Sequence, residues 1–196
     1  MMWLSLLFLL AAPFWVSKAP ADWTGEELQS LLSDSPWAQN LASPSNPAAP
    51  VVNVYIATAG PMAEAEAERD RRYRIKHPNA PADLMAEEYR AWLKENQGKA
   101  IVLAIALPPR DADRIENDSQ KMEEESVLRI GRKKFKMIGH FPPSPDDPFL
   151  RLAFPREVTA ADKTVNFDLY LPGVALPYRS AEFRIKDMIV NGKLEI

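Results

Sequence analysis

Cysteine is absent from this chain of 196 residues, and glycine and histidine are scarce, with seven and two residues respectively. Without cysteine, the chain cannot form disulfides, a thiolate nucleophile or a cysteine-ligated zinc or iron–sulfur centre. The glycines form no Walker or dinucleotide-binding pattern, so no glycine-rich cradle for a phosphate is expected. His77 and His140 each stand at the end of an expected element, and a shared metal site requires the fold to bring them together. No cofactor and no metal is predicted.

The chain also has no large excess of positive or negative charge. Lys and Arg number 24 against 27 Asp and Glu, which gives a formal net charge of −3. This balance argues against a protein that neutralises nucleic-acid phosphates. Hydrophobic residues make up 46% of the chain, as in ordinary globular proteins.

The first 21 residues are predicted to be a signal peptide. An apolar run extends from Trp3 to Val16, and Ala19-Pro20-Ala21 supplies the small residues that precede a signal-peptidase cut. We expect cleavage between Ala21 and Asp22, which leaves no membrane span and exports the protein to the periplasm or beyond. The run is short for a bilayer, which needs about 20 apolar residues. An uncleaved anchor is the alternative.

Residues 22–42 are predicted to be a separate helical segment, followed by a proline-rich linker at 43–50. Thr24 and Glu27 form a capping box, and Ser35-Pro36 is typical of a second helix start. Trp23 and Trp37 are the candidate partner-binding residues, because large aromatic side chains on a short tethered helix suit an interface. The alternative is that they dock on the protein's own domain.

Residues 51–196 are predicted to form an α+β domain, mainly an antiparallel β-sandwich. A strand at 51–58 is followed by a helical insertion at 61–97, and an apolar strand at 100–107 comes next. From Val127 onward the apolar residues alternate, which is typical of half-buried strands. Asn191-Gly192 predicts a tight hairpin turn.

The clearest alternation lies in Thr164–Leu171. Val165, Phe167 and the two leucines that follow at the same spacing are expected to point into the core. Asp168 and Tyr170 are expected to face outward.

Two charged clusters admit two interpretations each. The basic run from Arg69 to His77 follows three glutamates, which suits a solvated helix face, although a lipid or nucleic-acid patch is the alternative. Asp146-Asp147 and Asp162 are candidates for an acid pair or a calcium site. However, the residues beside these aspartates in the sequence are typical of turns, and a structural role in a turn is the other interpretation.

Two stretches carry a resemblance to known proteins. They are Trp23 and Glu27 with the run 31–39, and Phe183 with the run 187–195. With the strand and helices between them, these stretches resemble a group of exported bacterial proteins, of acidobacterial type, known as hypothetical or GWxTD-domain proteins. The resemblance implies export and no particular activity.

These observations predict an exported, non-enzymatic protein that binds a protein or a component of the cell envelope. The alternative is a hydrolase that uses Asp or Glu residues in a cleft between the sandwich and the helical insertion. A concave pocket with two inward carboxylates would favour the hydrolase.

Overall fold

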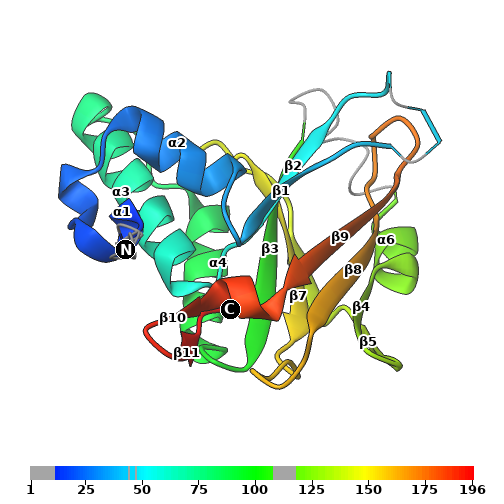
Figure 1. Ribbon diagram of the computed structural model, residues 1–196. Helices are drawn as coiled ribbons and strands as arrows, with labels where there is room; N and C mark the ends of the chain where they lie inside the picture. Colours follow the sequence, from blue (N-terminus) through cyan, green and yellow to red (C-terminus); the bar gives the residue numbers. More distant parts are fainter. Residues whose placement is uncertain (1–11, 44, 47, 108–117) are drawn as a thin grey trace, which may run out of the picture.

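The computed structural model describes residues 12–43, 45–46, 48–107 and 118–196 (Figure 1). The first eleven residues of the expected signal peptide lie outside this part. The helices are α1 (Phe14–Ser17), η1 (Pro20–Asp22), α2 (Gly25–Ser33), α3 (Gly60–Lys76), α4 (Leu84–Glu95), α6 (Ser119–Glu125) and η3 (Ile185–Met188). The strands are β1 (Ala38–Leu41), β2 (Val52–Ile56), β3 (Ala100–Ala106), β4 (Val127–Ile130), β5 (Lys133–Lys136), β6 (Gly139–Phe141), β7 (Phe149–Pro155), β8 (Thr164–Tyr170), β9 (Tyr178–Arg184), β10 (Ile189–Val190) and β11 (Lys193–Leu194).

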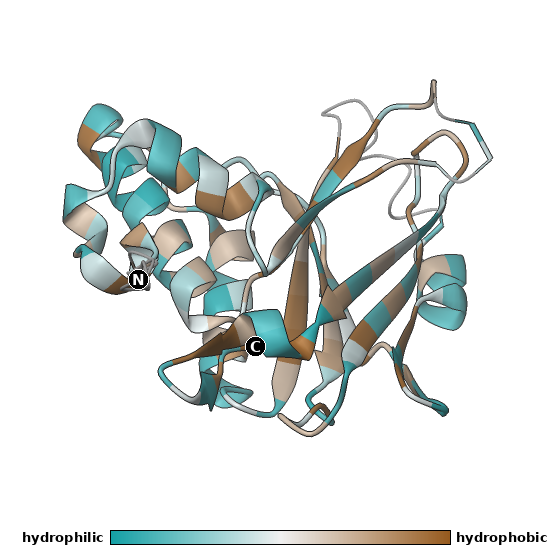
Figure 2. Ribbon diagram, viewed as in Figure 1, coloured by the Kyte–Doolittle hydropathy of each residue, from teal (hydrophilic) through white to brown (hydrophobic). Residues whose placement is uncertain are grey.

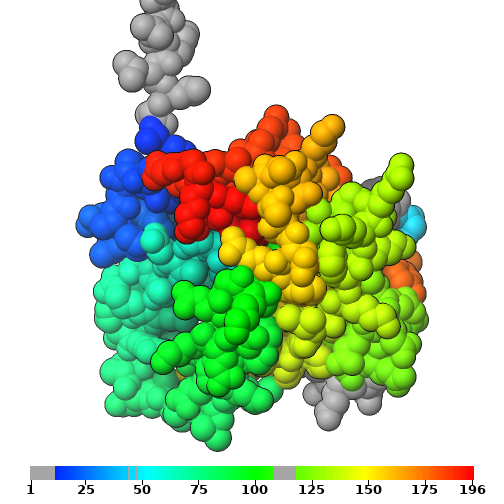
Figure 3. Space-filling view, turned by 90° about the horizontal axis from the view of Figure 1, so that it is seen from below, coloured from blue at the N-terminus to red at the C-terminus, as the bar shows by residue number. Residues whose placement is uncertain are grey.

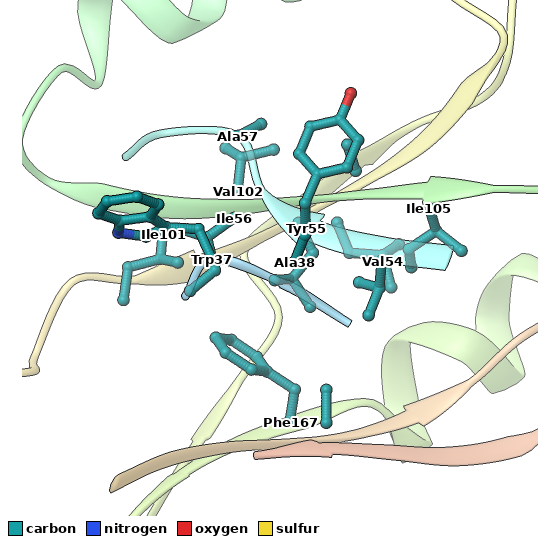
Figure 4. Packing of buried hydrophobic residues seen from close by; sticks show 14 of the residues in the cluster. Trp37, Ala38, Val54, Tyr55, Ile56, Ala57, Ile101, Val102, Ile105 and Phe167 are labelled. Carbon is teal, nitrogen blue, oxygen red and sulfur yellow. The ribbon is translucent and has the colours of Figure 1, made fainter. Parts of the chain in front are cut away.

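Two antiparallel sheets form the sandwich that the sequence predicts. Sheet A has the strand order β1-β2-β3-β7-β6, and sheet B has the order β5-β4-β8-β9. The two sheets pack through aromatic rings, with the Phe154 and Phe167 centroids 5.3 Å apart. Figure 4 shows Phe167 reaching from sheet B towards the strands of sheet A. The apolar strands make up the centre of the molecule, and the polar helices lie outside them (Figure 2).

Helices α2, α3 and α4 cover the other face of sheet A, so the molecule has three layers (Figure 1). Helices α3 and α4 form the helical insertion expected after the strand at 51–58. Sheet register pairs Ala104 with Tyr55 on one side and with Arg151 on the other. Because directly paired residues share a face, all three side chains point towards the helices. Figure 4 shows Tyr55 directed away from Phe167.

The segment 22–42 is part of the domain rather than a helical appendage. Thr24 and Glu27 form the predicted capping box at the start of α2, and the leucines of this helix are buried. The second helix expected from Ser35 is wrong, because that stretch turns into β1, which pairs with β2 along the edge of sheet A. Backbone pairing to β2 satisfies the amide groups that a second helix would have used.

The predicted C-terminal hairpin is confirmed. Asn191 and Gly192 join β10 to β11 with φ values of 51° and 79°. A two-residue turn of this type needs positive φ at both positions, which Asn and Gly tolerate best.

Candidate ligand-binding pocket

A pocket of about 610 Å³ lies between α3, α4 and the helix-covered face of sheet A. This volume falls within the range of about 300–1,000 Å³ that is usual for small-molecule sites. Its apolar lining consists of Ala57, Ala63, Ala67, Ile75, Ala86, Tyr89 and Leu93. Its charged lining consists of Glu66, Asp70, Asp147, Arg71, Arg74, Arg90 and Arg151.

Arg151 forms the polar wall of the pocket and is 2% exposed. It stands in the apolar strand β7, opposite the small side chain of Ala104, which leaves room for the guanidinium on the sheet surface. Its Nε and Nη2 donate to the two carboxylate oxygens of Asp147 at 2.9 and 2.8 Å. Its Nη1 donates to Oε1 of Glu66 on α3 at 2.6 Å. One buried cation therefore ties sheet A to the helical layer.

The environment keeps Arg151 charged. Burial by itself lowers the pKa of this guanidinium, but the nearby Glu66 carboxylate and the hydrogen bonds to Asp147 raise it overall. A buried charge is tolerated only when it is paired in this way. The guanidinium also lies 4.7 Å from the centroid of the Tyr89 ring.

Two buried tyrosines belong to the same polar network, and of these Tyr89 lines the pocket. The Tyr55 hydroxyl donates to Oε1 of Glu66 at 2.6 Å, and Nη1 of Arg69 donates to that hydroxyl at 3.3 Å. Burial raises the pKa of both Tyr55 and Tyr89, so both hydroxyls stay protonated at neutral pH. The Tyr89 hydroxyl is buried beside Arg151, and the described part of the chain supplies no acceptor for its proton. A buried donor without an acceptor calls for a partner from outside the protein.

The cations near the pocket fall into two groups. Arg71 and Arg72 both donate to Glu68, and the hydrogen bond from Arg71 contributes most to lowering the pKa of that carboxyl to about 2. Arg74 and Arg90, by contrast, make no ion pair or hydrogen bond with other described residues, and both are exposed at the pocket. Arg74 and Arg90 therefore carry the positive charge at the pocket that is not neutralised by an ion pair.

A second pocket, of about 540 Å³, continues along α4 towards the C-terminus. It shares Ala57, Ala63, Arg90 and Leu93 with the first pocket. The two pockets together form a groove whose shared part is apolar apart from Arg90, whereas the rest of the second pocket is lined mainly by polar and charged residues.

Both candidate tryptophans are packed inside the protein. Trp23 is 2% exposed and Trp37 is fully buried, with its Nε1 donating to the carbonyl of Glu195 at 2.7 Å. In Figure 3 the C-terminal residues lie beside the N-terminal segment. Phe14 and Trp15 cover these rings, at centroid distances of 5.8 Å to Trp23 and 6.0 Å to Trp37. The alternative expected from the sequence, docking on the protein's own domain, is what the structure shows.

The other candidate residues are dispersed. Asp147 lies under Arg151, whereas Asp162 accepts hydrogen bonds from Thr159 in an exposed turn. His77 stacks on Tyr73 at the end of α3, and His140 pairs with Glu123. Within the described ranges, no group of three His, Asp or Glu residues could hold a metal ion.

The sequence interpretation missed Arg151, Glu66 and Tyr89. One signal was available for Arg151, since an arginine inside a continuous apolar strand is rare unless it is paired. The pairing with Glu66 could not be found in this way, because the two residues are 85 positions apart.

Comparisons of the chain with protein-family models, curated proteins and solved structures gave no match. Of the helices that the structure describes, none has the length and apolar character needed to cross a membrane.

Proposed function

We propose that this is an exported protein that acts by binding a component of the cell envelope, and that the pocket between α3 and α4 is its binding site. The observation that carries this proposal is a pocket of ligand size whose polar wall is built from a buried, fully paired arginine. Such a wall is preorganised, so a ligand meets a fixed surface at low entropic cost. Export is supported by the apolar run and the small residues before Asp22, and by the resemblance to exported bacterial proteins.

The alternative, a carboxylate-dependent hydrolase, is supported by one observation. Glu66 and Asp147 are two carboxylates at the wall of a concave pocket. Both oxygens of Asp147 already accept hydrogen bonds from Arg151, however, and Oε1 of Glu66 accepts from both Arg151 and Tyr55. An acid–base pair needs one carboxyl that is free to donate a proton to a substrate. The two carboxylates are used instead to neutralise a buried cation, which favours binding.

Thermal melting of the purified protein against a panel of small amphiphiles tests binding at this site. A ligand that binds only the folded state raises the melting temperature in a saturable way. Ala67→Phe places a ring in the pocket from the exposed side of α3 and should abolish this shift. Ala91→Phe, on an exposed position of α4 away from the pocket lining, is the matched control. Equal shifts in both variants would place binding elsewhere, and turnover of a ligand that Glu66→Gln abolishes would favour the hydrolase.

Amino-terminal sequencing of the protein from the exported fraction tests the localisation. The expected sequence begins Asp-Trp-Thr-Gly, from Asp22. An intact Met1 in a washed membrane fraction would instead support the uncleaved anchor.

A further inference from the structure

The charges that line the first pocket do not cancel in pairs. Four arginines and three acidic residues line it, and each acidic residue already has a cation partner. Asp70 pairs with Arg69 at 3.1 Å, while Glu66 and Asp147 share Arg151. After this pairing, the charges that remain without a described partner are those of Arg74 and Arg90. An uncharged or cationic ligand would leave both arginines unused.

These two arginines line the same two pockets. Both line the first pocket and a smaller pocket of about 270 Å³, whose lining also includes Asp83, Glu87 and Asp146. Both carboxylate oxygens of Asp83 already accept hydrogen bonds from backbone amides. They come from different helices, Arg74 from the last turns of α3 and Arg90 from α4. Guanidinium groups on opposite walls of one opening can hold the two oxygens of a carboxylate or a related acid group.

The rest of the groove has a different chemistry. Ala63 and Ala67 on α3 face Leu93 on α4 across a floor formed by Ala57. Short side chains leave space in this apolar part, where the first pocket joins the second. The one unpartnered buried donor in the first pocket is the Tyr89 hydroxyl, as far as the described residues show, and it requires an oxygen acceptor that the protein does not supply. An apolar groove with cations and a hydroxyl donor suits a molecule with an acidic head and an apolar tail.

We propose that the pocket between α3 and α4 binds an amphipathic organic anion, with its acid group held by Arg74 and Arg90 and its apolar tail along the Ala63 and Ala67 face of α3. The oxygens of the acid group also accept a hydrogen bond from the Tyr89 hydroxyl. This inference rests on the proposed binding function and names the ligand class for the same site.

Titration calorimetry with three ten-carbon probes tests the ligand class. Decanoate has the acid head, decanol has a neutral head, and decyltrimethylammonium has a cationic head on the same tail. We expect decanoate to bind at least tenfold more tightly than decanol, and the cation to show no saturable binding, because a charge-assisted hydrogen bond contributes about 1.5–3 kcal/mol. Equal affinity for decanoate and decanol would overturn the assignment of an anionic head.

Three variants assign the contacts. Arg74→Gln and Arg90→Gln should each weaken decanoate binding about tenfold and leave decanol binding unchanged. Tyr89→Phe keeps the buried ring and removes the donor, and should weaken decanoate binding severalfold. Arg132→Gln, in the exposed turn between β4 and β5, is the matched control for loss of a surface cation and should change nothing. Equal losses in Arg132→Gln would show that net charge, rather than this pocket, attracts the anion.

The same measurements distinguish a wrong ligand class from the absence of a binding site. If decanol binds as tightly as decanoate, or if the cation binds, and Ala67→Phe abolishes that binding, the pocket is a ligand site but the anionic class is wrong. If none of the probes and none of the wider panel shifts the melting temperature in an Ala67-dependent way, the proposed binding function fails as well.

Discussion

Arg151 joins the structure of the pocket to the stability of the protein, because its side chain is buried between sheet A and the helical layer. Its guanidinium makes hydrogen bonds of 2.6–2.9 Å to Glu66 and Asp147, which come from different parts of the fold. Removing a single partner from such a network leaves buried charges without compensation. The residue therefore cannot be exchanged without consequences for the layers on both sides of it.

Arg151→Met is predicted to lower the free energy of unfolding by about 3–5 kcal/mol, since the buried Asp147 would lose its cation and the half-buried Glu66 would keep only the Tyr55 hydroxyl as a partner. Denaturant melts measure this loss. Arg129→Met is the matched control, because Arg129 is 41% exposed and pairs with Asp168 at the surface of sheet B. That surface pair is expected to contribute no more than about 1 kcal/mol. Similar losses in the two variants would show that the Arg151 network contributes no more to stability than a surface ion pair.

Glu68 predicts a dependence of stability on pH. Hydrogen bonds, first from Arg71 and then from Arg72, lower its pKa from the ordinary value of 4.5 to about 2. Because the folded-state pKa is the lower one, the ion pairs stabilise the fold above about pH 4.5, and this contribution is lost as the pH falls towards about 2. Glu68→Gln should therefore be less stable than the parent at pH 7, with the difference vanishing near pH 2.

Melts of both proteins between pH 7 and pH 2 measure this convergence. Glu64→Gln, on an exposed position of the same helix, should track the parent throughout. A stability difference in Glu68→Gln that stayed constant down to pH 2 would contradict the ion-pair explanation.

At the scale of elements, strand β8 shows how far an alternating pattern can be trusted. Val165, Phe167 and Leu169 are buried as predicted, and Asp168 lies on the opposite face, paired with Arg129. The prediction that Tyr170 faces solvent is wrong, since it is 7% exposed. Helix α6 covers its outer face, with Lys121 lying 4.6 Å from the ring centroid. Oγ of Ser126, the residue after α6, accepts a hydrogen bond from the Tyr170 amide.

This register leads to a prediction for neighbouring positions of β8. Phe167→Ala should lower the free energy of unfolding by about 3–5 kcal/mol, because the ring fills the space between the two sheets. Asp168→Ala should cost about 1 kcal/mol or less, because its ion pair with Arg129 is exposed to solvent. Denaturant melts of the two variants test the ranking. The reverse order would mean that the strand is shifted by one residue.

At the scale of the whole molecule, the three layers depend on the segment before the expected domain. Strand β1 forms the edge of sheet A, and the leucines of α2 and both Trp23 and Trp37 belong to the core. The C-terminus closes the same region through the bond between Trp37 and Glu195. Segments from the two ends of the chain therefore stabilise each other.

Two truncations test this arrangement. Removal of residues 1–21 should leave a cooperative melt at a lower temperature, because Phe14 and Trp15 no longer cover Trp23 and Trp37. Removal of residues 1–42 should abolish the cooperative melt, because an edge strand and a buried helix face are lost together. Calorimetry distinguishes the two cases. A truncated chain 43–196 that melts cooperatively would show that the segment 22–42 is a separable docking element after all.

The sequence by itself determined the features that depend on neighbouring residues. These features are the α+β class and the antiparallel sandwich, the helical insertion, the capping box of α2 and the Asn191-Gly192 turn. Each follows from the hydrophobic period, a helix cap or a turn sequence, which act over a few residues.

Only the tertiary structure decided the pocket. Glu66 and Arg151 meet across 85 positions, and Trp37 meets Glu195 near the C-terminus across 158. Contacts at such separations follow from strand order and layer packing, which no local pattern specifies. For the same reason Trp23 and Trp37 lie in the core, and Arg74 of α3 and Arg90 of α4 line one pocket.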